Sequence, residues 1–391
     1  SITSLEAQLS GTYRVGNGGD FTSLSQAYDS LRTHGINGTL YLSVISDLTG
    51  TQRLNGSVPG ASISNPIIIT SSTHHADSFT IGTSVTSSSY ALFLDNGVSH
   101  VHFKDISIGE TTNSLQKCGV YFDLCNASYS NIVFKNCNIN TYIGTGLQNT
   151  YAAVHYKGTN NSPYYADNLC FIHNNIRGGY YNMLFEYPAG SATGMYNRKG
   201  SIIDNNHLSD AYACGIYSNS YGFYHSISYN TITTSTSHSE YNGIFTNNYT
   251  SIDSIIGNKI HVNVSGTVYG MRLYKYQNYN LSHGALGPMF IANNEMIIHC
   301  SKCYAFYLYG NTNYSQFDVF HNSVFISGTE SCQGLYWYPR DSNYKASFIN
   351  NNIHISTPDL AYLFHFGKSD YITSAFAKID YNNYYRDKNG S

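Results

Sequence analysis

The stretch Ser226-Ile227-Ser228-Tyr229-Asn230-Thr231-Ile232 holds the pattern that decides the fold: alternating apolar residues followed by Asn-x-apolar. This pattern recurs with asparagines 32, 24, 28, 36, 28, 29 and 31 residues apart. The copies are Asn174-Asn175-Ile176, Asn206-His207-Leu208, Asn230-Thr231-Ile232, Asn258-Lys259-Ile260, Asn294-Glu295-Met296, Asn322-Ser323-Val324, Asn351-Asn352-Ile353 and Asn382-Asn383-Tyr384. A constant core with variable spacing is typical of a solenoid, in which each repeat is one unit and insertions become loops.

A second pattern lies between these copies, in which a small residue precedes a short strand with alternating apolar positions. The copies are Gly119-Val120-Tyr121-Phe122, Ala153-Val154-His155-Tyr156, Gly215-Ile216-Tyr217, Gly243-Ile244-Phe245, Gly270-Met271-Arg272-Leu273, Ala305-Phe306-Tyr307-Leu308, Gly334-Leu335-Tyr336-Trp337 and, with Tyr in the small position, Tyr362-Leu363-Phe364-His365. A β-propeller blade needs four strands in about 40–45 residues, which the shorter steps cannot hold. The repeats therefore predict an all-β parallel β-helix with one coil per repeat.

The recurring asparagines have a physical cause in this fold. Parallel strands of successive coils lie about 4.8 Å apart, so identical positions stack in columns. A stacked, inward-turning asparagine hydrogen-bonds to the copies before and after it and satisfies backbone groups of the turn. We therefore expect the column from Asn174 to Asn382 to be structural.

The N-terminal segment differs from the repeats. Phe21, Leu24, Ala27, Tyr28 and Leu31 share one helical stripe. The segment 23–26 has the form of a capping box, and a glycine at position 35 stands where a helix would stop. This predicts a short amphipathic helix that covers the first coil, within an N-terminal cap region (residues 1–60) that also holds the first strands. Residues 61–391 are expected to form the β-helix coils as one continuous domain.

Composition excludes several classes of protein. Only 43 of the 391 residues are charged (11%), the net charge is −3, and 38 residues are tyrosine. The many aromatic residues argue against disorder, and the absence of a basic surplus argues against a nucleic-acid partner. No apolar stretch approaches the roughly 20 residues of a membrane span. The eight cysteines lack zinc-site spacing, so no metal site is expected, and their disulfide pairing stays open.

Two stretches resemble a known family. Gly11-Thr12-Tyr13-Arg14-Val15-Gly16, followed by Gly19-Asp20-Phe21-Thr22-Ser23-Leu24, resembles the opening of right-handed β-helix domains of the pectate-lyase-like superfamily. Asp380-Tyr381-Asn382-Asn383-Tyr384-Tyr385 is similar to the last coil of such domains in large secreted bacterial surface proteins. The resemblance implies a right-handed β-helix at the cell surface or outside the cell. It implies no single activity, because the superfamily includes lyases, hydrolases, adhesins and phage tail parts.

In the second strand of each repeat, the residue between two inward positions should point outward. The resulting line is mostly aromatic, and we expect it to bind an extended polymer, most simply a polysaccharide, in an adhesin or glycan-targeting role. The predicted ligand-binding residues are Tyr121, Phe185, Tyr217, Phe245, Tyr307, Tyr336 and Phe364. Two alternatives stay open: loops cover this line, or it is a protein–protein interface. A facing error of one residue would invert the assignment.

Catalysis is the second hypothesis, and the low charge ranks it below binding. The superfamily's lyases imply a base and calcium-binding carboxylates, so Ca²⁺ is expected only if the chain is a lyase; otherwise no cofactor is expected. The best ionisable candidates for a lyase or glycoside hydrolase are His155, Lys157, Arg272 and Tyr274. His155 and Arg272 are four coils apart, roughly 19 Å at strand spacing. The third hypothesis is a structural module, with a further domain or partner protein at the bare C-terminal coil.

Overall fold

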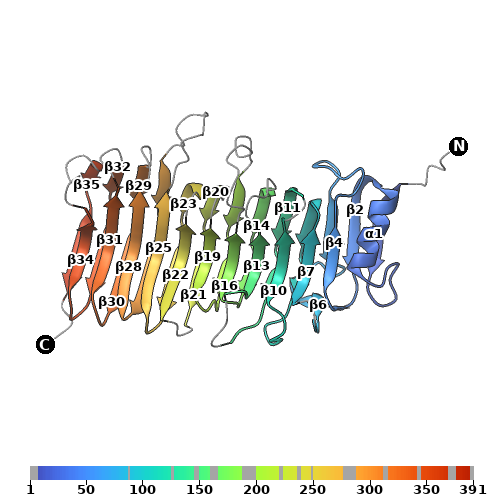
Figure 1. The fold of residues 1–391 in the computed structure, drawn as a ribbon, viewed down its shortest axis with the longest axis horizontal. Coiled ribbons are helices and arrows are strands. Elements are labelled where there is room, and N and C mark those ends of the chain that lie inside the picture. The colour runs from blue at the N-terminus through green and yellow to red at the C-terminus, as the bar shows by residue number, and fades with distance from the viewer. Residues whose placement is uncertain are drawn as a thin grey trace.

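The computed structural model describes residues 8–86, 89–124, 127–144, 149–158, 166–186, 200–219, 223–235, 239–247, 250–275, 288–310, 316–340, 345–368 and 376–387. Within these ranges the chain winds into successive coils, each made of one strand from each of three parallel sheets (Figure 1). The chain is a right-handed parallel β-helix, as the repeats and the resemblance predicted.

We call the three sheets A, B and C, in the order in which one coil visits them. Sheet A consists of β1 (Leu9–Val15), β2 (Ile36–Val44), β5 (Ile67–Ser71), β8 (Ser99–Lys104), β11 (Tyr129–Lys135), β14 (Ala166–Ile172), β17 (Ser201–Asp204), β20 (Phe223–Ser228), β23 (Ser251–Ile256), β26 (Met289–Ala292), β29 (Gln316–Phe320), β32 (Lys345–Ile349) and β35 (Phe376–Asp380). Sheet B consists of β3 (Leu48–Thr49), β6 (Thr80–Thr83), β9 (Ser107–Ile108), β12 (Asn138–Asn140), β15 (Asn175–Arg177), β18 (His207–Ser209), β21 (Thr231–Thr234), β24 (Lys259–Asn263), β27 (Glu295–Cys300), β30 (Ser323–Gly328), β33 (Asn352–Ser356) and β36 (Asn383–Asp387). Sheet C consists of β4 (Gln52–Asn55), β7 (Tyr90–Asp95), β10 (Cys118–Asp123), β13 (Ala152–Lys157), β16 (Tyr181–Glu186), β19 (Cys214–Asn219), β22 (Glu240–Asn247), β25 (Thr267–Lys275), β28 (Lys302–Gly310), β31 (Cys332–Pro339) and β34 (Ala361–Phe366).

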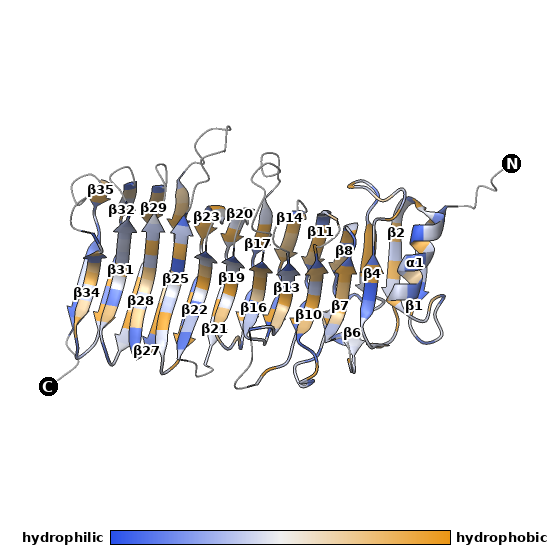
Figure 2. Cartoon of the chain, viewed as in Figure 1, coloured by the Kyte–Doolittle hydropathy of each residue, from blue (hydrophilic) through white to orange (hydrophobic). Residues whose placement is uncertain are grey.

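The interior is filled by the inward-facing half of every strand. Apolar and polar positions alternate along the strands, as the colour bands in Figure 2 show. Identical inward positions stack from coil to coil. The rings of Phe103, Phe134 and Phe171, for example, lie 4.7 and 5.1 Å apart with nearly parallel planes. All seven cysteines in the described ranges are buried free thiols.

The corner between sheets A and B is held by the predicted asparagine ladder. Its eight members are Asn174, Asn206, Asn230, Asn258, Asn294, Asn322, Asn351 and Asn382. The residue before each one has a positive φ, and this left-handed residue turns the chain so that the asparagine points inward. At each link the backbone N–H and Nδ2 of one asparagine both donate to Oδ1 of the next; between Asn230 and Asn258 both bonds are 3.0 Å. The structural role of this column is confirmed.

The predicted N-terminal helix is also confirmed. α1 (Leu24–His34) begins after Ser23, whose side chain accepts a hydrogen bond from the Gln26 N–H, and ends at Gly35, which has a φ of 73°. Leu24, Ala27, Tyr28 and Leu31 are fully buried, and α1 lies at the N-terminal end of the coils (Figure 1). No sheet breaks at residue 60, so a boundary there stays a prediction. The short 3-10 helix η1 (Ala76–Ser78) precedes β6.

Candidate functional site: the outer face of sheet C

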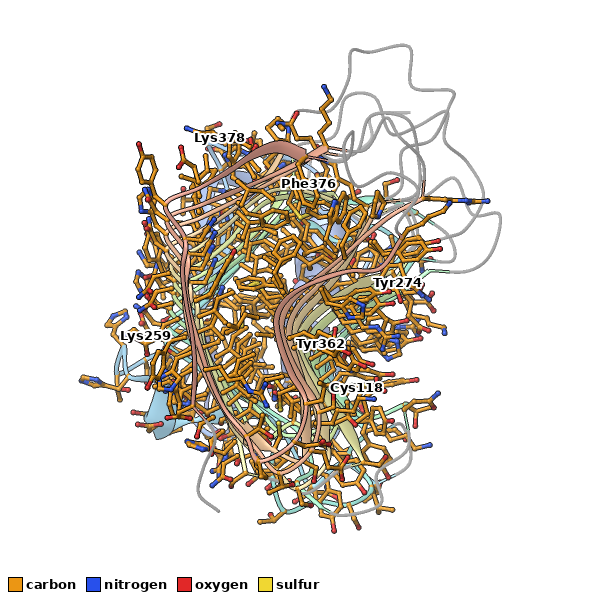
Figure 3. The ribbon with its side chains drawn as sticks, turned by 90° about the vertical axis from the view of Figure 1, so that its left-hand side faces the viewer. Cys118, Lys259, Tyr274, Tyr362, Phe376 and Lys378 are labelled. Atoms are coloured by element: carbon orange, nitrogen blue, oxygen red, sulfur yellow. The ribbon has the colours of Figure 1, made fainter. Side chains whose placement is uncertain are left out.

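Strand register defines one central column along sheet C, which is exposed or partly exposed except at His155 and Leu184, where it is buried. Residues at these positions pair from coil to coil and alternate with buried neighbours. The column, which we call the axial column, consists of Arg53, Phe93, Tyr121, His155, Leu184, Tyr217, Phe245, Arg272, Tyr307, Tyr336 and His365. In the end-on view of Figure 3, Tyr274 of sheet C lies on the side of the molecule opposite Lys259 of sheet B.

Five of the seven predicted ligand-binding residues stand in the axial column: Tyr121, Tyr217, Phe245, Tyr307 and Tyr336. The outward placement of Phe185 and Phe364 is wrong. Phe185 is fully buried, and Phe364 packs against the core. In strand register their places in the axial column are taken by Leu184 and His365, but Leu184 is buried, with only 3% of its surface exposed.

Both errors arise at the position two residues before the axial column, where a small residue marks which side chains of a strand face outward. Glycine fills it where the neighbouring coil comes close: a Cβ on Gly243 would lie 2.5 Å from the Gly270 carbonyl oxygen. In β16 the equivalent position is Asn182, and in β34 it is Leu363 rather than Tyr362. Without a glycine or alanine, the sequence gives no marker for the frame, and a shift of one residue inverts the facing.

Rings of the axial column stack on one another along the solenoid. Tyr217 and Phe245 lie 4.7 Å apart with planes 18° from parallel, and Tyr307 and Tyr336 lie 4.7 Å apart at 17°. In these two pairs each ring covers a face of its neighbour on the adjacent coil, whereas Tyr121 and Tyr336 meet His155 and His365 edge-on. A ligand on the stacked part of this face would therefore meet ring edges and hydroxyls.

The rings are densest on β25, β28 and β31. We define the tyrosine patch as Tyr269, Arg272, Tyr274, Tyr304, Tyr307, Tyr309, Tyr336 and Tyr338, all of which are partly exposed. Tyr269 stacks on Tyr304 with centroids 4.9 Å apart, and Tyr309 stacks on Tyr338 at 5.1 Å. Tyr269 and Tyr304 were missed in the sequence. Their signal was present, because each stands three residues before its axial-column residue, across the small position.

Arg272 lies at the centre of the tyrosine patch. Its guanidinium carbon is 4.6 Å from the Tyr269 ring centroid and 4.8 Å from that of Phe245. Nη1 donates to Glu240 Oε1 at 3.0 Å, and Nη2 to the Tyr274 hydroxyl at 3.4 Å. Burial alone would lower the pKa of Arg272, but Tyr274, Tyr269 and Glu240 outweigh burial and raise it. Arg272 is therefore held as a cation by its neighbours.

The phenols beside Arg272 are neutral hydrogen-bonding groups. Burial raises the pKa of Tyr269 to about 12 and raises the pKa of Tyr336 above its ordinary value. A protonated phenol both donates and accepts a hydrogen bond. The patch therefore combines one cation with several donors and acceptors on a largely uncharged surface.

A second polar cluster lies three coils away from the patch. His155 Nε2 is 2.8 Å from Glu186 Oε2, and Lys157 Nζ donates to the same oxygen at 2.7 Å. Burial would raise the pKa of Glu186, but the bonds and charges of His155 and Lys157 outweigh burial and lower it to about 2. Since the ionised carboxylate only accepts, His155 Nε2 carries a proton. The polar groups of His155, Lys157 and Glu186 thus bond to one another. Glu186 is the partner of His155 and Lys157 that the sequence did not reveal.

The four catalytic candidates do not converge. His155 and Lys157 share β13, whereas Arg272 and Tyr274 share β25, four strand steps along sheet C. At about 4.8 Å per step, no single reacting atom reaches both pairs. Among the described residues no group of three or more His, Cys, Asp or Glu side chains is placed to hold a metal ion. Their catalytic role and the Ca²⁺ expectation stay predictions.

Comparison with known proteins finds only distant similarity. No protein-family model matches the chain, and no curated protein matches it. The Dettilon tailspike protein is 12% identical with a TM-score of 0.37, over 90% of this chain and 67% of the tailspike. Pectin methylesterase from Aspergillus niger is 12% identical with a TM-score of 0.27, over 98% of this chain and 88% of the enzyme. Such distant likeness does not bear on the activity of this chain.

Proposed function

We propose that this protein binds an extended carbohydrate polymer along the outer face of sheet C, with the tyrosine patch as the main contact. One observation carries the proposal. Seven partly exposed tyrosines gather around one partly buried cation, Arg272, on three adjacent strands. Hydroxyl groups repeat there at strand spacing, about 4.8 Å along the axis. A polymer whose sugar units have a similar length can meet equivalent groups on successive coils.

The proposed binding mode is hydrogen bonding to phenol hydroxyls and contact with ring edges. Stacked rings hold each other in place, so little side-chain freedom is lost when a ligand binds. Arg272 adds a charge-assisted donor near the centre of the face. In keeping with the family resemblance, we propose an extracellular or cell-surface setting and an adhesin or glycan-targeting role. The described part of the chain holds no helix long and apolar enough to cross a membrane.

Conservative variants test this proposal. Tyr304→Phe/Tyr307→Phe/Tyr336→Phe removes three hydroxyls and keeps the ring stacks. We expect at least tenfold weaker retention in affinity electrophoresis through polysaccharide-containing gels, because each lost hydrogen bond costs about 0.5–1.5 kcal/mol. Thermal stability should stay near that of the wild type.

Matched controls lie on other surfaces. Tyr41→Phe/Tyr229→Phe/Tyr385→Phe removes three exposed hydroxyls away from sheet C and should leave retention unchanged. The proposal fails if no polysaccharide of a broad panel retains the wild type. It also fails if the sheet C variant is retained as strongly as the wild type.

An enzymatic role has weaker support. A glycoside hydrolase needs a carboxylic acid that donates a proton near neutral pH. Glu186, with a pKa of about 2, is ionised there and is held by two cationic or donor side chains. Release of reducing ends or unsaturated products from any polysaccharide of the panel would restore the lyase or hydrolase hypothesis.

A further inference from the structure

A hollow lies on the opposite side of the solenoid from the tyrosine patch, on the outer face of sheet B. This groove has a volume of about 580 Å³, within the range of about 300–1,000 Å³ that is usual for small-molecule sites. Every lining residue is polar. We define groove B by these residues: Asp77, Ser107, Asn138, Asn140, Asn175, Arg177, His207, Ser209 and Asp210.

Two outward columns of sheet B form the floor of groove B. Asn138 pairs with Asn175, and Asn175 pairs with His207 on the next coil. Two residues further on, Arg177 lies between its partners Asn140 and Ser209. These strands are only three residues long, so the two columns form a compact grid of side chains about 4.8 Å apart along the axis.

Hydrogen bonds within groove B fix the amide side chains. Asn138 Nδ2 donates to Asp77 Oδ1 at 2.6 Å, and Asn175 Nδ2 donates to Asn138 Oδ1 at 2.9 Å. These contacts orient the amides before any ligand arrives. No described residue donates to Asn175 Oδ1, which is an acceptor on an exposed side chain.

The far end of groove B carries an ion pair. Arg177 Nε donates to Asp210 Oδ2 at 2.6 Å, and the Arg177 side chain remains about half exposed. This contact uses Nε, so it leaves the two terminal nitrogens of the guanidinium to act as donors. Groove B therefore offers acceptors from amides and carboxylates beside donors from a guanidinium.

Charge selects among possible ligands. Two carboxylates, Asp77 and Asp210, face one guanidinium, Arg177, which disfavours an anionic ligand such as a uronate. A metal ion is disfavoured because the described residues contain no group of three or more ligating side chains. Mixed donors and acceptors without net positive charge suit a neutral molecule rich in hydroxyl groups.

We propose that groove B is a second carbohydrate site, which binds one or two neutral sugar residues by hydrogen bonds. It is independent of the sheet C face, since it lies on another sheet and shares no residue with it. A polymer-binding protein with such a site would hold a long chain on one side and a short, uncharged sugar on the other.

Saturation-transfer NMR tests the proposal with the methyl glycosides of glucose, galactose, mannose and N-acetylglucosamine. The experiment uses the Tyr304→Phe/Tyr307→Phe/Tyr336→Phe protein, so that the tyrosine patch contributes little. We expect saturation transfer to at least one neutral glycoside, and its loss in the added variant Asn175→Ala/Arg177→Ala. Arg177→Gln alone, a milder change, should weaken the signal if the double variant folds poorly.

The matched control is Lys259→Ala/His261→Ala, which alters the same two columns on β24 and should leave the signal unchanged. Three results would overturn the proposal. They are no transfer to any of the four glycosides, a signal that Asn175→Ala/Arg177→Ala does not reduce, or stronger transfer to methyl galacturonate than to every neutral glycoside. Any of these can occur whether or not the sheet C face binds a polymer.

Discussion

Each ladder asparagine satisfies several buried groups at once. Asn258 Oδ1 accepts from both N–H and Nδ2 of Asn230, while its own Nδ2 donates to the Ile227 carbonyl at 2.8 Å and to Asn294 Oδ1 at 3.0 Å. Its own backbone N–H also donates to Asn294 Oδ1. No other side chain of this size supplies a carbonyl and an amide in this arrangement.

Asn258→Ala should therefore be strongly destabilising. The buried N–H of Asn230 and the carbonyl of Ile227 lose their partners, and each unsatisfied group costs about 1–3 kcal/mol. We expect a total loss of roughly 3 kcal/mol in the free energy of unfolding, measured by urea denaturation. Asn352→Ala, which changes an exposed asparagine one position after a ladder member, should cost less than about 0.5 kcal/mol. Equal losses in the two variants would show that the ladder is not a main source of stability.

Residue identity alone revealed the ladder but not its surroundings. The Asn-x-apolar pattern is visible because every copy keeps the same type at the same position. Only half of the His155–Lys157–Glu186 cluster was visible in the sequence, because Glu186 ends β16, whose frame has Asn182 in place of a small residue. Register in space, which depends on neighbouring coils, decides which side chains meet.

A helix or strand can be predicted from sequence where its start, its apolar face and its end are all marked by residues within the element itself. α1 was predictable because Ser23, the apolar stripe and Gly35 are read within one short segment. Groove B was not predictable in this way. Its floor consists of three-residue strands from separate coils, and its wall includes Asp77 of η1, which is 61 residues before its partner Asn138.

The link between β13 and β16 gives a pH-dependent prediction. The folded-state pKa of Glu186, about 2, lies below its unfolded value of about 4.3. Its stabilising contribution is therefore complete above about pH 4.3 and is lost as the pH falls towards 2. We expect the wild type to exceed Glu186→Gln in unfolding free energy by roughly 1–2 kcal/mol at pH 6, after allowance for solvent screening. This difference should shrink towards zero near pH 2.

Urea denaturation of both proteins across this pH range measures the difference. Glu295→Gln is the matched control, because Glu295 pairs with His261 on the more exposed face of sheet B. Its effect should stay below about 1 kcal/mol. A constant difference between wild type and Glu186→Gln from pH 6 to pH 2 would contradict the assigned ion pairs.

The two ends of the whole molecule differ. α1 covers the first coil, whereas the last coil leaves core positions open. Ile379 occupies the same inward column as the fully buried Phe348 but is 49% exposed. We propose this exposed coil face as a contact for a partner protein.

The simplest partner for this exposed coil is a second copy of the same chain. We expect sedimentation velocity over a wide dilution series to show a concentration-dependent oligomer, and Ile379→Lys to remove it because a charge would be buried in the contact. Ile63→Lys changes a more exposed isoleucine (68%) outside the last coil and should have no effect. A wild type that stays monomeric at every concentration would rule out self-association and leave only a different partner.

The asparagine ladder also gives the solenoid a direction. In every link the donors belong to the earlier coil and the acceptor to the later one, so the amide dipoles line up and polarise one another. Asn382 repeats the bond to the preceding coil, through Nδ2 to the Phe348 carbonyl at 2.7 Å, but the described residues hold no ninth asparagine to accept from it. The last described member of the ladder therefore presents amide donors that no described asparagine accepts. A surface that offers carbonyl or carboxylate oxygen at that corner matches it, while one that offers N–H groups is repelled.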